Sequence, residues 1–142
     1  MQQRGQNAKG FEELEHTADV ALRVRGRDMR ELFANAAEGM FSLIGHCQRG
    51  ATPRFADEIR LHAPDRAALL IDWLNELLYL GEANNARYYA FTFHRLTPTL
   101  LEAHVAGDPL VSRWKTIKAA TFHDLRISET PEGWEVTVVF DI

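Results

Sequence analysis

Apolar and polar residues alternate along two segments in the first half of the chain, the pattern of strands that are buried on one face only. In residues 18–26 the apolar positions share one parity, and Asp19 lies on the polar side near the start of the segment. Residues 58–63 show a shorter version of the same alternation. Both segments are therefore predicted to be half-buried strands.

Each predicted strand leads into an aspartate and then into apolar residues at helical spacing. Asp28 and Asp65 are suitable helix N-caps, because a carboxylate there accepts a hydrogen bond from the first turn. Gly45 is expected to end the first helix, and Asn84 with Asn85 the second. The two units align at an offset of 37 residues. Either a duplicated strand–helix–strand unit or the general likeness of such units explains this match.

The second half of the chain is predicted to be strand-rich. Residues 45–53 and 107–109 are expected to be a loop and a break. Four strand-like segments, the third of them interrupted, are 88–96, 99–107, 117–127 and 134–140. The order of elements predicts a single α+β domain: a mostly antiparallel sheet packed by two helices.

Composition is that of a globular domain. The 142 residues are 46% hydrophobic and 25% charged, and no apolar run approaches the roughly 18–20 residues of a membrane span. Residues 1–10 are polar and are expected to be a flexible tail, which leaves 11–142 as the domain. With no signal peptide, a cytoplasmic location is expected. The net charge of −4 argues against direct, high-affinity nucleic-acid binding.

Most familiar catalytic motifs are absent. The sequence has no glycine-rich phosphate loop and no zinc-binding spacing. The single cysteine, Cys47, excludes an internal disulfide and is interpreted as a free thiol, since adjacency to His46 is not the geometry of a nucleophile and its base. The other histidines at 62, 94 and 104 share no spacing and receive no role.

Acidic residues and a histidine gather at the entry to the first predicted strand. Glu13, Glu15, His16 and Asp19 supply hard oxygen ligands and one imidazole, which suit Mg²⁺, Ca²⁺ or Mn²⁺. The alternative is a solvated turn in which Asp19 bonds to local backbone.

The last residues carry a second acidic group. Asp141 follows an apolar strand, and an α-carboxylate on Ile142 would lie one residue away. Adjacent carboxylates are costly unless a cation or hydrogen-bond donors neutralise them. If the first and last predicted strands pair, Asp19 joins this group. The alternative is a frayed terminus with a solvated aspartate.

Two residues of the penultimate strand-like segment are weaker candidates. His123 has the parity of Leu125 and Ile127 and is expected to be a hydrogen-bonded core histidine. Lys118 has the opposite parity and could bring an ammonium group beside the acidic cluster. Structural roles for both remain the alternative.

Five segments together resemble the archease family, in the family's order and from about Phe11 to the last residue. The fourth has Ala120 and Phe122 where the family pattern is closer to a larger aliphatic residue and a tyrosine. The segments are Glu15-His16-Thr17-Ala18-Asp19-Val20, Glu31 to Phe41, Leu69 to Leu80, Ile117 to His123, and Gly133-Trp134 with Val138 to Ile142.

The resemblance implies an accessory protein of an RtcB-type RNA ligase, which joins RNA ends with GTP and Mn²⁺ in tRNA splicing and RNA repair. It implies promotion of ligase guanylylation and of multiple turnover, without catalysis by the protein itself. It also implies a divalent-metal site (Ca²⁺, Mg²⁺ or Mn²⁺) at Asp19, Asp141 and the Ile142 carboxylate. His16 is added as a neighbour, with Lys118 and His123 as a secondary site.

Two other functions stay open. A chaperone-like accessory module for RNA-modifying enzymes would depend on an exposed apolar patch and not on the acidic residues. A stand-alone metal-dependent hydrolase would use the acidic cluster as its active site, although no positioned general base is evident.

Overall fold

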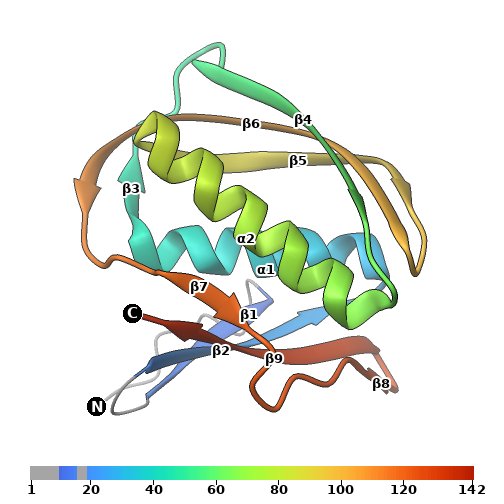
Figure 1. Cartoon of the computed structure of the whole chain (residues 1–142). Coiled ribbons are helices and arrows are strands. Elements are labelled where there is room, and N and C mark those ends of the chain that lie inside the picture. The colour runs from blue at the N-terminus through green and yellow to red at the C-terminus, as the bar shows by residue number, and fades with distance from the viewer. Residues whose placement is uncertain (1–9, 16–18) are drawn as a thin grey trace.

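The computed structural model describes residues 10–15 and 19–142 (Figure 1). The predicted tail thus lies outside the described residues except for Gly10. The elements in chain order are β1 (Phe11–Glu15), β2 (Asp19–Gly26), α1 (Met29–Ile44), β3 (Gly45–Cys47), β4 (Phe55–His62), α2 (Arg66–Asn84), β5 (Ala86–Leu96), β6 (Leu100–Arg113), β7 (Ala119–Thr121), β8 (Ser128–Thr130) and β9 (Gly133–Asp141).

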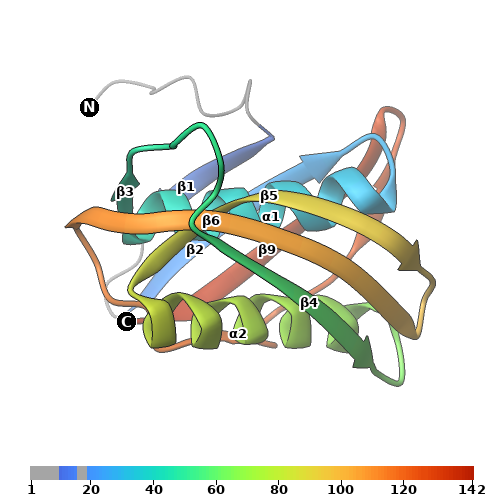
Figure 2. The ribbon, with the colours of Figure 1, turned by 90° about the horizontal axis from the view of Figure 1, so that it is seen from above.

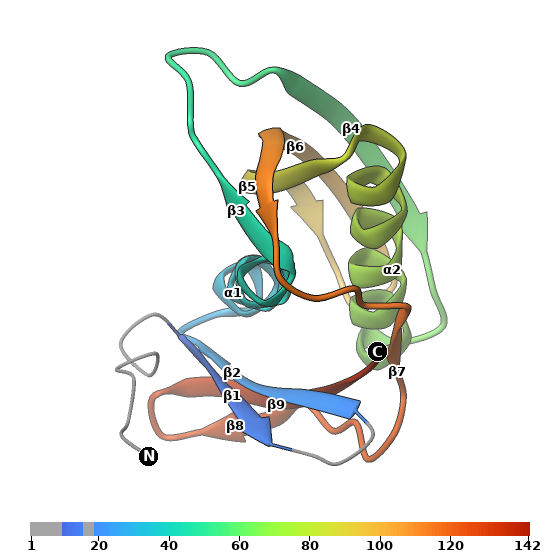
Figure 3. The same cartoon turned by 90° about the vertical axis from the view of Figure 1, so that its left-hand side faces the viewer.

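The strands form two antiparallel sheets with the helices between them (Figures 1 and 3). A five-stranded sheet has the order β1-β2-β9-β7, with β8 also on β9. A four-stranded sheet has the order β3-β6-β4, with β5 also on β6. The predicted α+β class is confirmed, but the single sheet of the prediction is two sheets. Alternation shows which face of a strand is buried and does not show which strands pair.

Both helices begin at the predicted aspartates. The Asp28 carboxylate accepts the Glu31 N–H at 2.9 Å, and the Asp65 carboxylate accepts the Ala68 N–H at 2.8 Å. Helix α1 ends at Gly45 because the chain there touches β6: a Cβ on Gly45 would lie 2.1 Å from the Ser112 carbonyl oxygen. None of the described helices is long and apolar enough to cross a bilayer.

The core lies between the two sheets; seen from above, β5 and β6 cross over α1, and β4 crosses over one end of α2 (Figure 2). Trp73 of α2 is fully buried and donates its indole N–H to the Phe33 carbonyl of α1 at 3.0 Å. The Trp73 ring also packs on Phe91 and Phe93 of β5. One aromatic side chain thus contacts α1, α2 and the four-stranded sheet.

Two predicted boundaries differ from the structure. The loop predicted at 45–53 starts as β3, and β6 continues through the predicted break at 107–109. Strand β6 changes partner there: Gly107 pairs with β4, and Leu110 pairs with Cys47 of β3. Between them the buried Asp108 accepts the backbone N–H groups of Gly50 and Arg54 at 3.1 and 3.0 Å. The break in pattern therefore marks an anchor for the loop and not the end of the strand.

The two N-caps yield a stability prediction. Asp28→Ala and Asp65→Ala are each expected to lower the free energy of unfolding by about 1 kcal/mol, because an N–H of the first turn loses its acceptor. Asp72→Ala is the control, since it removes an exposed carboxylate inside α2 and is expected to change stability by less than about 0.5 kcal/mol. Urea unfolding monitored by circular dichroism measures all three, and equal effects of Asp72→Ala and Asp65→Ala would contradict the capping role.

Candidate metal centre at the ends of two paired strands

Strands β2 and β9 bring two aspartates together. They lie side by side and pair antiparallel (Figure 1), and the register places Asp19 directly opposite Asp141. Directly opposed residues have Cβ atoms about 4.5–5.5 Å apart. The first and last predicted strands therefore do pair, and their pairing places Asp19 beside Asp141, as expected from the sequence for that case.

The two carboxylates share the outer face of their sheet. Their neighbours Val20 and Phe140 are buried in the core between the sheets, so Asp19 and Asp141 point to the opposite side. Asp19 is half-buried, with its Oδ1 atom shielded from solvent, and Asp141 is exposed. One carboxylate of the pair is thus partly shielded by the protein, and the other is accessible to solvent.

Strand β7 holds Asp141 from its other side. Ala119 is the register partner of Asp141 on β7, and the Lys118 N–H donates to the Asp141 carbonyl at 2.8 Å. Thr121 adds a hydrogen bond from its Oγ1 to the Val139 carbonyl at 2.9 Å. The end of β9 is therefore flanked by two strands, which limits the movement of Asp141 relative to Asp19.

The donor set suits a hard divalent cation in part. Carboxylate oxygens are the preferred ligands of Ca²⁺ and Mg²⁺ and also suit Mn²⁺. Across residues 10–15 and 19–142, no group of three or more His, Cys, Asp or Glu side chains is placed to hold a metal ion. Among the described residues, the side chains thus supply two carboxylates, and water, a partner's oxygen atoms or a carboxylate on the 41%-exposed Ile142 could add further ligands.

The other acidic residues of the predicted cluster do not all join this pair. Glu13 lies opposite Leu22, which faces the core, and its carboxylate is 3.9 Å from the Lys115 ammonium. It is therefore on the other side of the sheet from Asp19. His16, the predicted neighbour, lies outside the described residues.

The prediction that His123 is a core histidine is wrong. Strand β7 ends at Thr121, and the chain then turns, with Leu125 donating to the Phe122 carbonyl at 3.0 Å and Asp124 at a φ of 51°. Parity along a strand has no meaning across this turn. His123 is exposed, with its Nε2 3.3 Å from an Asp124 carboxylate oxygen.

Lys118 and Phe122 flank β7 in exposed positions. The Lys118 backbone reaches Asp141, as described above, and its side chain is exposed. Phe122, which stands where the family pattern has a tyrosine, is 57% exposed. Its ring therefore forms part of the surface and not of the core.

Cys47 and His46 are not arranged as a nucleophile and its base. They are adjacent in β3, and their side chains alternate: His46 is exposed and Cys47 is buried. Burial raises the pKa of the Cys47 thiol, which lowers its thiolate fraction. The interpretation of Cys47 as a free thiol is consistent with this placement.

Strand register creates one charged cluster that sequence spacing did not reveal. On the four-stranded sheet the Glu58 carboxylate lies 2.6 Å from His104 Nδ1 and 3.3 Å from His94 Nε2. The hydrogen bond from His104 is the main cause of a lowered Glu58 pKa. Only the register, which pairs Glu58 with His104, could have shown this contact.

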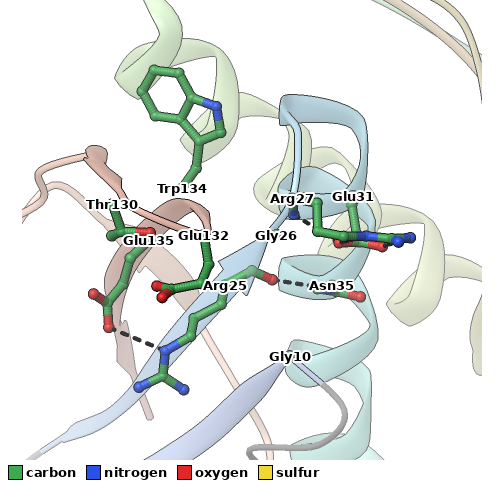
Figure 4. Close-up of a pocket in the computed structure, with 10 residues that line it drawn as sticks. All are labelled: Gly10, Arg25, Gly26, Arg27, Glu31, Asn35, Thr130, Glu132, Trp134 and Glu135. Atoms are coloured by element: carbon green, nitrogen blue, oxygen red, sulfur yellow. Dashed lines mark hydrogen bonds and ion pairs between the residues drawn. The ribbon is translucent and has the colours of Figure 1, made fainter.

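A pocket of about 580 Å³ lies at the opposite end of β2 and β9 (Figure 4). Its charged groups are largely paired with one another: Arg25 with Glu135 at 3.5 Å, and Arg27 with Glu31 at 3.0 Å. Arg27 lowers the pKa of Glu31 through their hydrogen bond. Asp19 is seven residues from Gly26, or about 23 Å along the strand, so this pocket is separate from the two aspartates.

Residues 11–142 match the model of the Archease protein family. Archease proteins from Methanosarcina barkeri and Methanosarcina acetivorans are 35% and 36% identical, and each alignment covers 94% of this chain and 97% of the relative. Protein archease of Saccharolobus solfataricus is 35% identical, over 93% of this chain and 98% of the relative.

Two experimental structures have similar folds. The solution structure of protein 1598 from Methanobacterium thermoautotrophicum has a TM-score of 0.73 at 29% identity and covers 94% of this chain and 99% of its own. The crystal structure of an archease, described as a possible chaperone, from Thermotoga maritima has a TM-score of 0.65 at 20% identity, over 92% and 96%. Family, relatives and fold agree, and the chain belongs to the archease family.

Proposed function

We propose that this protein binds a divalent metal ion and activates an RtcB-type, GTP-dependent RNA ligase in tRNA splicing and RNA repair. Its role would be to promote guanylylation of the ligase and so sustain multiple turnover. Membership of the archease family supports the proposal. The observation that carries it is the placement of Asp19 opposite Asp141 at the accessible end of β2 and β9.

The two aspartates would hold the cation, which is Ca²⁺, Mg²⁺ or Mn²⁺ in this proposal. When bound, such an ion supplies positive charge that offsets charge on phosphate groups. Asp19 contributes from the half-buried side and Asp141 from the exposed side. Two protein carboxylates leave most of the coordination sphere to water and to a partner's oxygen atoms, as is usual for Mg²⁺ at phosphate sites.

The surface charge fits an accessory role in the cytoplasm. The net charge of −4 does not suit direct binding to RNA, so the ligase would supply the basic surface that holds the RNA. In this proposal the protein is not itself an enzyme, and it acts by presenting its metal ion to the partner's nucleotide site.

A chaperone-like accessory module is the second candidate. Its support is the exposure of large apolar side chains, with Trp114 at 64% and Phe122 at 57%. Such a module would work without Asp19 and Asp141, whereas a metal-dependent activator needs both. A stand-alone hydrolase has no matching observation among the described residues. Substitution of the aspartates therefore distinguishes the two candidates.

Cation binding is the first prediction from the proposed function. Addition of Mn²⁺ or Ca²⁺ is expected to raise the melting temperature of the wild type, because the ion binds only the folded pair. Asp141→Asn is expected to weaken binding at least tenfold and, without cation, to raise stability by up to about 1 kcal/mol as the like-charge contact is removed. Isothermal titration calorimetry and thermal melts measure both effects.

The control for this experiment is Asp124→Asn, which removes an exposed carboxylate on the turn after β7. It is expected to bind the cation as the wild type does. No binding by the wild type, or equal binding by Asp141→Asn, would refute the metal site.

Ligase activation is the second prediction. With GTP, Mn²⁺ and an RtcB-type ligase, a substoichiometric amount of wild-type protein is expected to accelerate guanylylation and sustain many ligation cycles. Asp19→Ala and Asp141→Ala are expected to remain folded and to abolish this stimulation, while Asp124→Asn retains it. Full stimulation by a folded Asp141→Ala protein would favour the chaperone-like candidate.

The position of Ile142 leads to a third prediction. If an α-carboxylate on Ile142 contributes to the site, a short extension after Ile142 would move that charge away from Asp141. The extension is expected to weaken cation binding and ligase stimulation, whereas an extension before Met1 leaves both unchanged. Equal behaviour of the two extended proteins in the same calorimetric and ligase assays would remove Ile142 from the ligand set.

A further inference from the structure

Asn75 of α2 forms a two-point contact with the backbone of β7. Its Oδ1 accepts the Ala120 N–H at 2.8 Å, and its Nδ2 donates to the Ala120 carbonyl at 3.2 Å. The two bonds define the orientation of the carboxamide, because the N–H must meet the oxygen and the carbonyl must meet the nitrogen. Asn75 therefore bonds to Ala120 as the peptide of a neighbouring strand would.

Strand β7 needs such a partner. It has only three residues, and it lies at the edge of the five-stranded sheet, with β9 on one side. Alternate residues of an edge strand direct their N–H and C=O groups away from the sheet. In β7 these groups belong to Ala120, which is only 4% exposed, so leaving them without partners would be costly.

The contact continues directly to the candidate metal centre. Ala119, next to Ala120, is the register partner of Asp141, and the Lys118 N–H binds the Asp141 carbonyl. On the other side of Asp141 lies Asp19. A helix side chain, a short strand and the end of β9 thus form one continuous hydrogen-bonded series that ends at the aspartate pair.

Helix α2 is a rigid support for this series. Trp73, Leu74 and Leu77, which surround Asn75 in the sequence, are fully buried in the core. Asn75 is therefore a half-buried polar residue on a helix whose other contacts are fixed by packing. Helix α2 therefore cannot move relative to α1 and the four-stranded sheet without disturbing that core.

We propose that Asn75 is a positioning residue for the metal site: by holding β7 against α2 it keeps Asp141 opposite Asp19. The inference rests on the proposed function for the metal itself. The effect of Asn75 on the stability of the contact between β7 and Asp141 can also be measured without any metal. Groups that orient metal ligands typically change affinity 10- to 100-fold when they are removed.

The test compares Asn75→Leu with Asn84→Leu. Leucine is close to asparagine in size and cannot form either hydrogen bond. Asn84 lies on the same helix, but its amide bonds to the Tyr88 hydroxyl at 2.9 Å, away from β7. The two matched substitutions thus separate a general loss of protein stability from a specific displacement of β7 and Asp141. Both proteins are compared with the wild type under conditions in which all are folded, as judged by circular dichroism.

Two measurements are made on each protein. The first is the Mn²⁺ dissociation constant from the electron paramagnetic resonance signal of free Mn²⁺. The second is hydrogen exchange of the Lys118 amide, followed by NMR without metal. Asn75→Leu is expected to weaken Mn²⁺ binding at least tenfold and to speed exchange at Lys118 at least tenfold. Asn84→Leu is expected to stay within about twofold of the wild type in both.

Wild-type behaviour of Asn75→Leu in either measurement would overturn the positioning role. Equal losses in the two variants would also overturn it, because they would show a general effect of stability. Failure of the wild type to bind Mn²⁺ would instead contradict the proposed function. There would then be no metal site whose ligands Asn75 could position. In that case the exchange rate alone decides whether Asn75 holds Asp141.

Discussion

The antiparallel pairing of β2 with β9 is the interaction on which both the core and the candidate site depend. Its inner face pairs Val20 with Phe140 and Leu22 with Val138, all four nearly or fully buried beneath the helices. A slip of one residue would turn this apolar set to the outside, so the register is strongly specified. The apolar residues that close the core thereby place Asp19 opposite Asp141.

Sequence patterns predicted the local elements well and the arrangement of the strands in sheets only in part. Alternation in β2 correctly put Asp19 on the polar face, and Asp28 and Asp65 correctly marked two helix starts. The division into two sheets could not be predicted, because it depends on pairings between strands far apart in the chain. Strands β1, β3 and β8 were missed because they have only five, three and three residues, too few for a clear alternation. The partner of β3 is also distant in the chain, whereas β1 pairs with the adjacent β2.

The candidate site shows the same division between local and long-range information. Asp19 and Asp141 could be proposed from the residues and from the family resemblance, but their contact required the β2–β9 register. Parity misplaced His123, because a turn after Thr121 interrupts the strand. Asn75 looked like any polar residue of a helix. Its partner, Ala120, is 45 residues away and contributes only backbone atoms, so no side-chain pattern could have indicated the contact.

The aspartate pair places two like charges opposite each other, unlike its neighbours on the same face of the sheet. Two other cross-strand partners there carry opposite charges: Arg23 with Glu12 at 3.1 Å, and Arg25 with Glu135 at 3.5 Å. Like charges directly opposite each other destabilise a sheet. A solvated chain end could relieve this repulsion by fraying, but β7 and Asn75 hold the end of β9 in place. Local rules are commonly broken at functional sites, where a ligand of the working protein offsets the cost. In the proposed function this ligand would be a divalent cation, because its positive charge and its preference for oxygen ligands suit two carboxylates.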